Sequence, residues 1–219
     1  MSEVLVVVAA GPGLGRSVAL RFAREGAAVG LVARSAGALD GLVAELGRTG
    51  AASVAVAAAD VSDDTALRAA LAELTGTLGA ATAVVYNGSA YVEGPVTALP
   101  PERLRLALDV GVVGALVTVQ ETVPSMRAAG RGTVVLTGSV AADRASTSAP
   151  AVGVAKAALR SLARSLHKEV AGDGVRVVSV TIDGVLAGPK ALDVDEIAEL
   201  YWDLHTRVEP PPDVVGFPA

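Results

Sequence analysis

Six runs of small and β-branched apolar residues alternate with segments of helical periodicity along the chain of 219 residues. The runs are continuously apolar, which is typical of strands covered on both faces. Regular alternation of strands and helices predicts a parallel sheet with right-handed crossovers. We therefore expect a single domain, 1–219, with an α/β doubly wound sheet of six to seven strands flanked by helices. The predicted strands are a run that begins at Val4 and residues 27–33, 53–59, 81–86, 133–137 and 175–182.

The intervals between these strands show the apolar spacing of helices. Ser62 is the expected N-cap of the third helix. Asp109 and Gly111 interrupt the longest apolar segment, which predicts two helices or one bent helix there. Residues 213–219 are too short a segment to assign. The predicted helices are a first one that ends near Gly26 and residues 36–48, 62–78, 101–129, 150–171 and 193–204.

Charge and residue usage exclude several classes of function. The net charge of −5 is spread along the chain without a Lys/Arg run, so we expect neither a nucleic-acid nor a membrane partner. The chain has no cysteine, and His167 and His205 are far apart, so no metal site is expected. The short apolar run after Glu3 is interpreted as a strand and no run reaches membrane-spanning length, which makes the cytoplasm the expected location.

A glycine-rich turn follows the first strand, in Gly11-Pro12-Gly13-Leu14-Gly15. Glycines let the backbone approach a ligand closely, and a helix that begins near Gly13 directs free N–H groups and a partial positive charge at that point. A pyrophosphate suits such a turn. The same glycines also occur where a strand simply packs on a helix, so the surrounding motifs have to decide.

Further motifs follow in a recognisable order. Gly13 and Gly15 match the last two glycines of the pattern T-G-x-x-x-G-x-G, while Ala9 stands at the first. Ser139 follows the fifth strand and Lys156 lies on the next helix. With these motifs the chain resembles the short-chain dehydrogenase/reductase family, in a divergent bacterial branch with a G-P-G-L-G turn. The resemblance implies a Rossmann-like fold and an NAD(P)-dependent oxidoreductase that acts on CH–OH or C=O groups.

Other strand-end loops match that family in part. Asp60-Val61 resembles the Asp that lies beside the adenine ring, although a loop Asp that caps the next helix is an equal alternative. Asn87 matches the second Asn of the N-N-A-G element. The other three positions of that element are occupied by Tyr86, Gly88 and Ser89. The cofactor-binding residues implied by the resemblance are Gly11, Gly13, Leu14, Gly15, Asp60, Val61, Asn87, Gly88, Lys156 and Ile182.

The choice of cofactor depends on the end of the second strand. An acidic residue there accepts hydrogen bonds from a ribose 2′-OH, whereas a basic one pairs with a 2′-phosphate. Arg34 occupies that position, and Arg16 after the glycine turn is expected to join it in a two-armed clamp. NADP(H) is therefore favoured over NAD(H). The alternative is that both arginines are solvated surface charges.

The active centre departs from the family pattern. The resemblance assigns an acid/base Tyr four residues before Lys156, but Val152 stands there and has no proton to donate. It also assigns an Asn on the preceding helix, where this chain has Gly111. Ser139, which aligns the carbonyl in the family, and Lys156 are retained.

Two functions remain open from the sequence. The first is an oxidoreductase for an unidentified small carbonyl or alcohol, whose proton comes from a water held by Lys156, from Ser139 or from Tyr91. The second is a catalytically inactive nucleotide-binding or assembly protein on the same fold. Tyr201 and Trp202 are interpreted as packing residues rather than ligands.

The resemblance also implies a homodimer or homotetramer, formed through the two long helices at 101–129 and 150–171. An apolar face on the second of these helices is either the subunit interface or core. Its residues are Ala155, Ala158, Leu159, Leu162 and Leu166.

Overall fold

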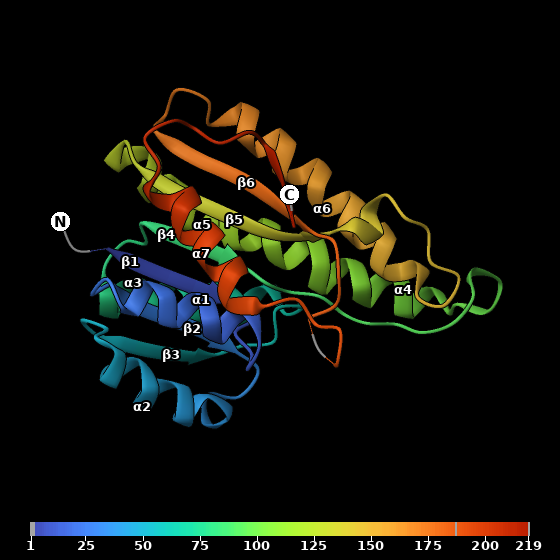
Figure 1. Ribbon diagram of the computed structural model, residues 1–219, viewed down its shortest axis with the longest axis horizontal. Coiled ribbons are helices and arrows are strands. Elements are labelled where there is room, and N and C mark those ends of the chain that lie inside the picture. Colours follow the sequence, from blue (N-terminus) through green and yellow to red (C-terminus); the bar gives the residue numbers. More distant parts are fainter. Residues whose placement is uncertain (1–2, 187, 219) are drawn as a thin grey trace.

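A seven-stranded parallel sheet is the centre of the computed structural model, which describes residues 3–186 and 188–218 (Figure 1). The strand order is β3-β2-β1-β4-β5-β6-β7, so β1 is an interior strand between β2 and β4, and all its residues are buried. Because every pair is parallel, the carboxyl ends of the strands meet at one edge. The strands are β1 (Val4–Val8), β2 (Ala28–Ala33), β3 (Val54–Ala58), β4 (Ala83–Tyr86), β5 (Gly132–Ser139), β6 (Val175–Ile182) and β7 (Val214–Phe217).

Helices cover both faces of the sheet. One apolar core lies between the sheet and α1, α2 and α7, and a second lies between the sheet and α3, α5 and α6. The helices are α1 (Leu14–Ala23), α2 (Asp40–Thr49), α3 (Asp64–Leu78), α4 (Pro101–Leu108), α5 (Gly114–Ala129), α6 (Pro150–Glu169) and α7 (Val194–Thr206). The doubly wound α/β fold expected from the sequence is confirmed.

The six predicted strands are all present, and β7 adds a seventh from the segment that was left unassigned. One predicted cap is wrong. The side chain of Asp63, rather than Ser62, accepts a hydrogen bond from the Ala66 N–H at 3.0 Å and caps α3. The Ser62 hydroxyl instead donates a hydrogen bond to the carboxylate of Asp60, two residues earlier in the same turn.

The predicted break in the longest helix is confirmed as a π-helix, Asp109–Val113, which joins α4 to α5. By length and composition alone Pro101–Ala129 is apolar enough to cross a membrane, contrary to the expectation from the sequence. However, 50% of its most apolar 18-residue window is buried inside the fold. We therefore interpret this stretch as part of the core.

The apolar face of α6 belongs to the core of its own chain. Ala155, Leu159 and Leu166 are buried there, so this face is not a free surface for a second subunit. Tyr201 and Trp202 are packing residues, as expected. Tyr201 is fully buried with its hydroxyl 2.9 Å from Thr137 Oγ1, and Trp202 packs edge-on against Phe22 of α1.

A polar network closes the edge of the sheet where the strands begin. His205 of α7 lies 3.2 Å from the Glu3 carboxylate and 3.1 Å from Thr133 Oγ1. Burial lowers the pKa of His205 below its usual value, and the charge of Glu3 only partly opposes this. Burial raises the pKa of Glu3, but the hydrogen bond from Thr82 and the charge of His205 outweigh it, so that pKa is also lowered.

Acidification through pH 6.5 and below is expected to destabilise the fold through His205. The unfolded chain binds a proton to this imidazole near pH 6.5, whereas the folded protein holds it neutral to lower pH, so unfolding takes up a proton. Urea unfolding at pH 7.5 and pH 5.5 measures how much free energy of unfolding is lost on acidification. This loss should be smaller in His205→Gln. His167→Gln is the control on the other histidine; an equal pH dependence in wild type and His205→Gln would contradict this assignment.

Candidate functional site

The glycine turn connects β1 to α1 in a conformation open to a ligand. Gly13 precedes the first helical residue, and a Cβ added at Gly11 or Gly13 would meet nothing within 4 Å. Gly15 has a different role, because a Cβ there would lie 3.2 Å from Ala10 Cα. Gly11 and Gly13 thus leave room for a phosphate at the helix N-terminus, whereas Gly15 allows α1 to pack against the turn.

Ala9 has a φ of 59°, the left-handed region that L-residues other than glycine seldom adopt. It stands where the family pattern has its first glycine. The departure seen in the sequence is therefore a strained backbone position, which costs on the order of 1 kcal/mol.

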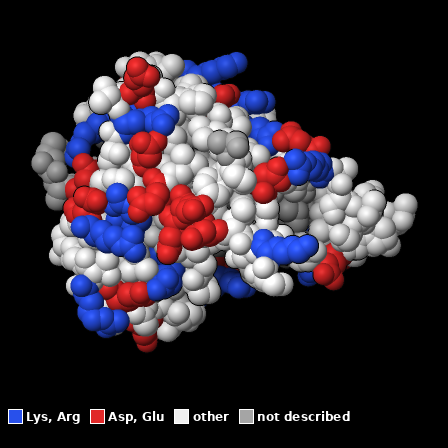
Figure 2. All heavy atoms as spheres, viewed as in Figure 1, with Lys and Arg blue, Asp and Glu red and all other residues white. Residues whose placement is uncertain are grey.

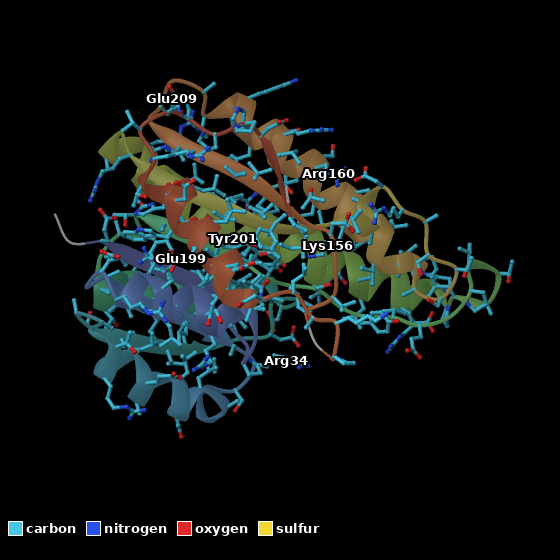
Figure 3. All side chains as sticks on the ribbon, in the orientation of Figure 1. Arg34, Lys156, Arg160, Glu199, Tyr201 and Glu209 are labelled. Atoms are coloured by element: carbon cyan, nitrogen blue, oxygen red, sulfur yellow. The ribbon has the colours of Figure 1, made fainter. Side chains whose placement is uncertain are left out.

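A cavity of about 470 Å³ opens beside this turn, at the carboxyl ends of β1 to β4. Figure 3 shows Arg34 on this side of the sheet, below Lys156 in the view. The sequence-predicted cofactor residues that line the cavity are Gly11, Arg34, Asp60, Val61, Asn87 and Gly88. Each follows one of four different strands, so the parallel sheet brings together residues from four separate loops.

The remaining predicted cofactor residues are not in the cavity lining. Leu14 and Ile182 are buried in the core, and Lys156 is buried beside the cavity turn at Gly88. Leu106 and Val110 do line it, and sequence reasoning missed them. Their spacing of one helical turn on the predicted helix 101–129 was the available signal.

The two arginines of the expected clamp have different surroundings. Arg34 is exposed at the cavity, and its charge contributes to a lowered pKa of Asp60, after the larger effect of the hydrogen bonds from Ser62. Arg16 instead forms an ion pair with Glu45 of α2, with Nε 2.9 Å from Oε2. Arg16 is thus paired within the protein, and the two-armed clamp remains a prediction. Asp60 lines the cavity and accepts hydrogen bonds from Ser62 within its own turn, whereas Asp63 caps α3, so the capping alternative for Asp60 is wrong.

Lys156 is buried, and its ammonium group donates to two main-chain carbonyls. The distances from Nζ are 2.7 Å to Thr137 O and 3.4 Å to Gly88 O. Burial lowers the pKa of Lys156 to about 8, since desolvation disfavours its charged form. Lys156 therefore links the end of β5 to the cavity turn after β4 and can exchange a proton near neutral pH.

The other three active-centre positions lie on β5, on α6 and in the π-helix. Ser139 ends β5 beside Ile182 of β6, and its Oγ accepts a hydrogen bond from Ala141 N at 3.2 Å. Val152 lies one turn before Lys156 on α6 and is half-buried. Gly111 lies in the π-helix, where a Cβ would be 3.0 Å from Ala155 Cβ, a tight contact that an Asn at this position would add to the packing against α6.

The surface provides no strongly basic face on the side seen in Figure 2, where acidic and basic side chains are interspersed. No cluster of three or more potential metal ligands occurs within residues 3–186 and 188–218. The fold and the cavity at its strand ends together define a nucleotide-binding protein of the doubly wound α/β class.

Comparison with known proteins makes this assignment more specific. The family model described as short chain dehydrogenase matches residues 3–191. The chain is 33% identical to 2-dehydro-3-deoxy-L-rhamnonate dehydrogenase (NAD(+)) of Sphingomonas sp. over 177 residues, which cover 80% of this chain and 69% of that protein. The chain therefore belongs to the short-chain dehydrogenase/reductase family, and it shares the NAD(P)-binding oxidoreductase character of that family.

Solved structures agree with this fold. A metagenomic short-chain oxidoreductase in complex with NADP has a TM-score of 0.88 at 25% identity, covering 98% of this chain and 96% of that one. An NAD⁺-bound xylitol dehydrogenase has a TM-score of 0.89 at 19% identity, covering 98% and 97%. Structures of this fold thus bind either dinucleotide.

Replacing Ala9 by glycine is expected to stabilise the protein by about 0.5–1 kcal/mol. Relief of the left-handed strain outweighs the extra entropy that glycine has in the unfolded chain. Ala10→Gly is the matched control, because Ala10 has no positive φ. This change should lower the stability of the protein, since glycine gains entropy in the unfolded chain without relieving any strain. Urea unfolding of the two variants measures both effects; a loss of stability in Ala9→Gly would show that the position is not strained.

Proposed function

We propose that the chain is an NADP(H)-dependent oxidoreductase for a small carbonyl or alcohol, with an atypical active site. The cavity supports this most directly, because Arg34 is the one Lys or Arg side chain among the described residues that line it. A guanidinium group pairs with a 2′-phosphate, whereas NAD(H) presents only a neutral 2′-OH at that position. The glycine turn fits the pyrophosphate, since Gly11 and Gly13 leave open space before α1.

Arg34→Ala is expected to weaken NADPH binding by about tenfold, the effect of losing one charge-assisted hydrogen-bonded pair. Affinity for NADH should change little, because it carries no 2′-phosphate. Arg16→Ala is the matched control: Arg16 is paired with Glu45, so its removal should leave the ratio of the two dissociation constants nearly unchanged. Fluorescence titration of the wild type and both variants with each cofactor measures these dissociation constants, and a wild type that prefers NADH would exclude the proposed cofactor choice.

The chemistry expected of the chain's residues follows from their surroundings. When bound, the nicotinamide ring supplies or accepts the hydride. The Ser139 hydroxyl orients the substrate oxygen, and the apolar Val152 transfers no proton. We infer that Lys156 holds the proton that reaches the substrate through water, since its pKa of about 8 lets it release and regain a proton near neutral pH. Ser139 and the exposed Tyr91 are the competing donors.

The alternative is a nucleotide-binding protein without catalysis. The observation in its favour is that both described hydrogen bonds of the Lys156 ammonium go to main-chain carbonyls, in a centre without the acid/base Tyr. In that case the cavity binds the dinucleotide but no carbonyl is reduced. The two functions differ in turnover, not in affinity.

Lys156→Met, which keeps the apolar stem, is expected to lower both NADPH affinity and turnover on a carbonyl panel, by about tenfold or more. Lys168→Met, at an exposed position on the same helix, is the control that should keep wild-type values. Val152→Tyr should raise the turnover of carbonyl substrates little if the wild type already reduces them. Activity that appears only in Val152→Tyr would instead favour the non-catalytic function.

We also propose that the protein acts in the cytoplasm as a homodimer or homotetramer. The family resemblance supports this assembly, and Leu116 of α5 and Val154 of α6 are exposed apolar residues on the two long helices. Light scattering of the purified protein determines the state of assembly.

A further inference from the structure

Tyr86 ends β4 with a side chain that is fully buried. Its hydroxyl donates a hydrogen bond to the carbonyl of Val110, in the π-helix that joins α4 to α5. Burial, and secondarily the charge of Asp60, raise the pKa of Tyr86. The hydroxyl therefore stays protonated and remains a donor at any physiological pH.

Two glycines make room for this ring. A Cβ at Gly88 would lie 2.6 Å from the Tyr86 hydroxyl oxygen. A Cβ at Gly114 would also meet that oxygen, and it would lie 2.6 Å from the Val61 carbonyl oxygen. Gly88, Gly114 and the Val61 backbone thus pack tightly around the Tyr86 side chain. The size of this side chain fixes the distances between these three segments.

Three of the segments around Tyr86 form walls of the cavity. Val61 follows β3, Gly88 follows β4 and Val110 lies in the π-helix, and all three line it. Gly88 also accepts the hydrogen bond from Lys156. Tyr86 itself is not in the lining, so any effect it has on a bound dinucleotide passes through these neighbours.

We propose that Tyr86 is a positioning residue for the dinucleotide, because its ring and hydroxyl hold the Val61, Gly88 and Val110 walls at the spacing that the ligand requires. This role rests on the proposed function of the cavity. Tyr86 is not the missing acid/base group: its hydroxyl is committed to Val110, it is buried, and its pKa is raised rather than lowered.

The test compares two buried tyrosines that each lose one hydroxyl. Tyr86→Phe keeps the ring but removes the bond to Val110. It should weaken NADPH binding about threefold to fivefold, because the free energy of this internal bond is the upper limit on what the cavity loses in pre-organisation. Tyr201→Phe is the matched control, because its hydroxyl bonds to Thr137 Oγ1 and neither residue lines the cavity. It should change NADPH affinity less than twofold. Unliganded melting temperatures, measured alongside, should fall in both variants.

A second variant tests the contact by another route. Gly114→Ala places a methyl group against both the Tyr86 hydroxyl and the Val61 carbonyl oxygen. It should weaken NADPH binding in wild type and weaken it less in the Tyr86→Phe background, where only the contact with Val61 remains close. Equal losses in the two backgrounds would contradict the contact.

The outcomes separate this proposal from the proposed function. NADPH binding that Tyr86→Phe leaves unchanged, or that Tyr201→Phe weakens equally, overturns the positioning role alone. A wild type that binds neither NADPH nor NADH overturns both. Selective weakening in Tyr86→Phe supports the role, because a merely structural effect would follow the melting temperature in both variants.

Discussion

Burial of β1 on both faces is the constraint on which the rest of the structure depends. Every residue from Val4 to Val8 is buried, and the strand pairs in parallel with β2 on one side and β4 on the other. Parallel pairing requires each connection to return across a face of the sheet, which is why helices cover both faces. It also brings the loops after β1, β2, β3 and β4 to one edge, where they line a single cavity.

The fold was largely predictable because continuous β-branched runs and helical spacing are strong local signals. The errors occur where a local signal is weak or ambiguous. The strand β7 is only Val214–Phe217 and follows three prolines, so its short length hid it although Val and Phe favour strands, and pairing with β6 establishes it. Ser62 and Asp63 are both good N-caps, and the choice between them depends on the geometry of the turn at Asp60.

The site was predictable where a residue directly follows a strand, because topology alone brings such residues together. It was not predictable where a side chain from another element decides. Arg16 is a clear phosphate-binding candidate in the sequence, but Glu45, 29 residues away, pairs with it. Tyr86 is visible in the sequence only as a departure from N-N-A-G, since its partner Val110 is 24 residues further on.

The two lost catalytic positions are unequal in physical terms. Val152 is a half-buried residue on α6, one turn before Lys156. Gly111 is packed against Ala155 in a π-helix whose neighbouring carbonyl is bonded to Tyr86. Because the ring of Tyr86 in turn requires Gly88 and Gly114, the Asn position borders a tightly packed cluster. A side chain at 111 first meets Ala155 Cβ at 3.0 Å, so α6 or the π-helix has to give by a few tenths of an ångström before the Asn of the family pattern can stand there.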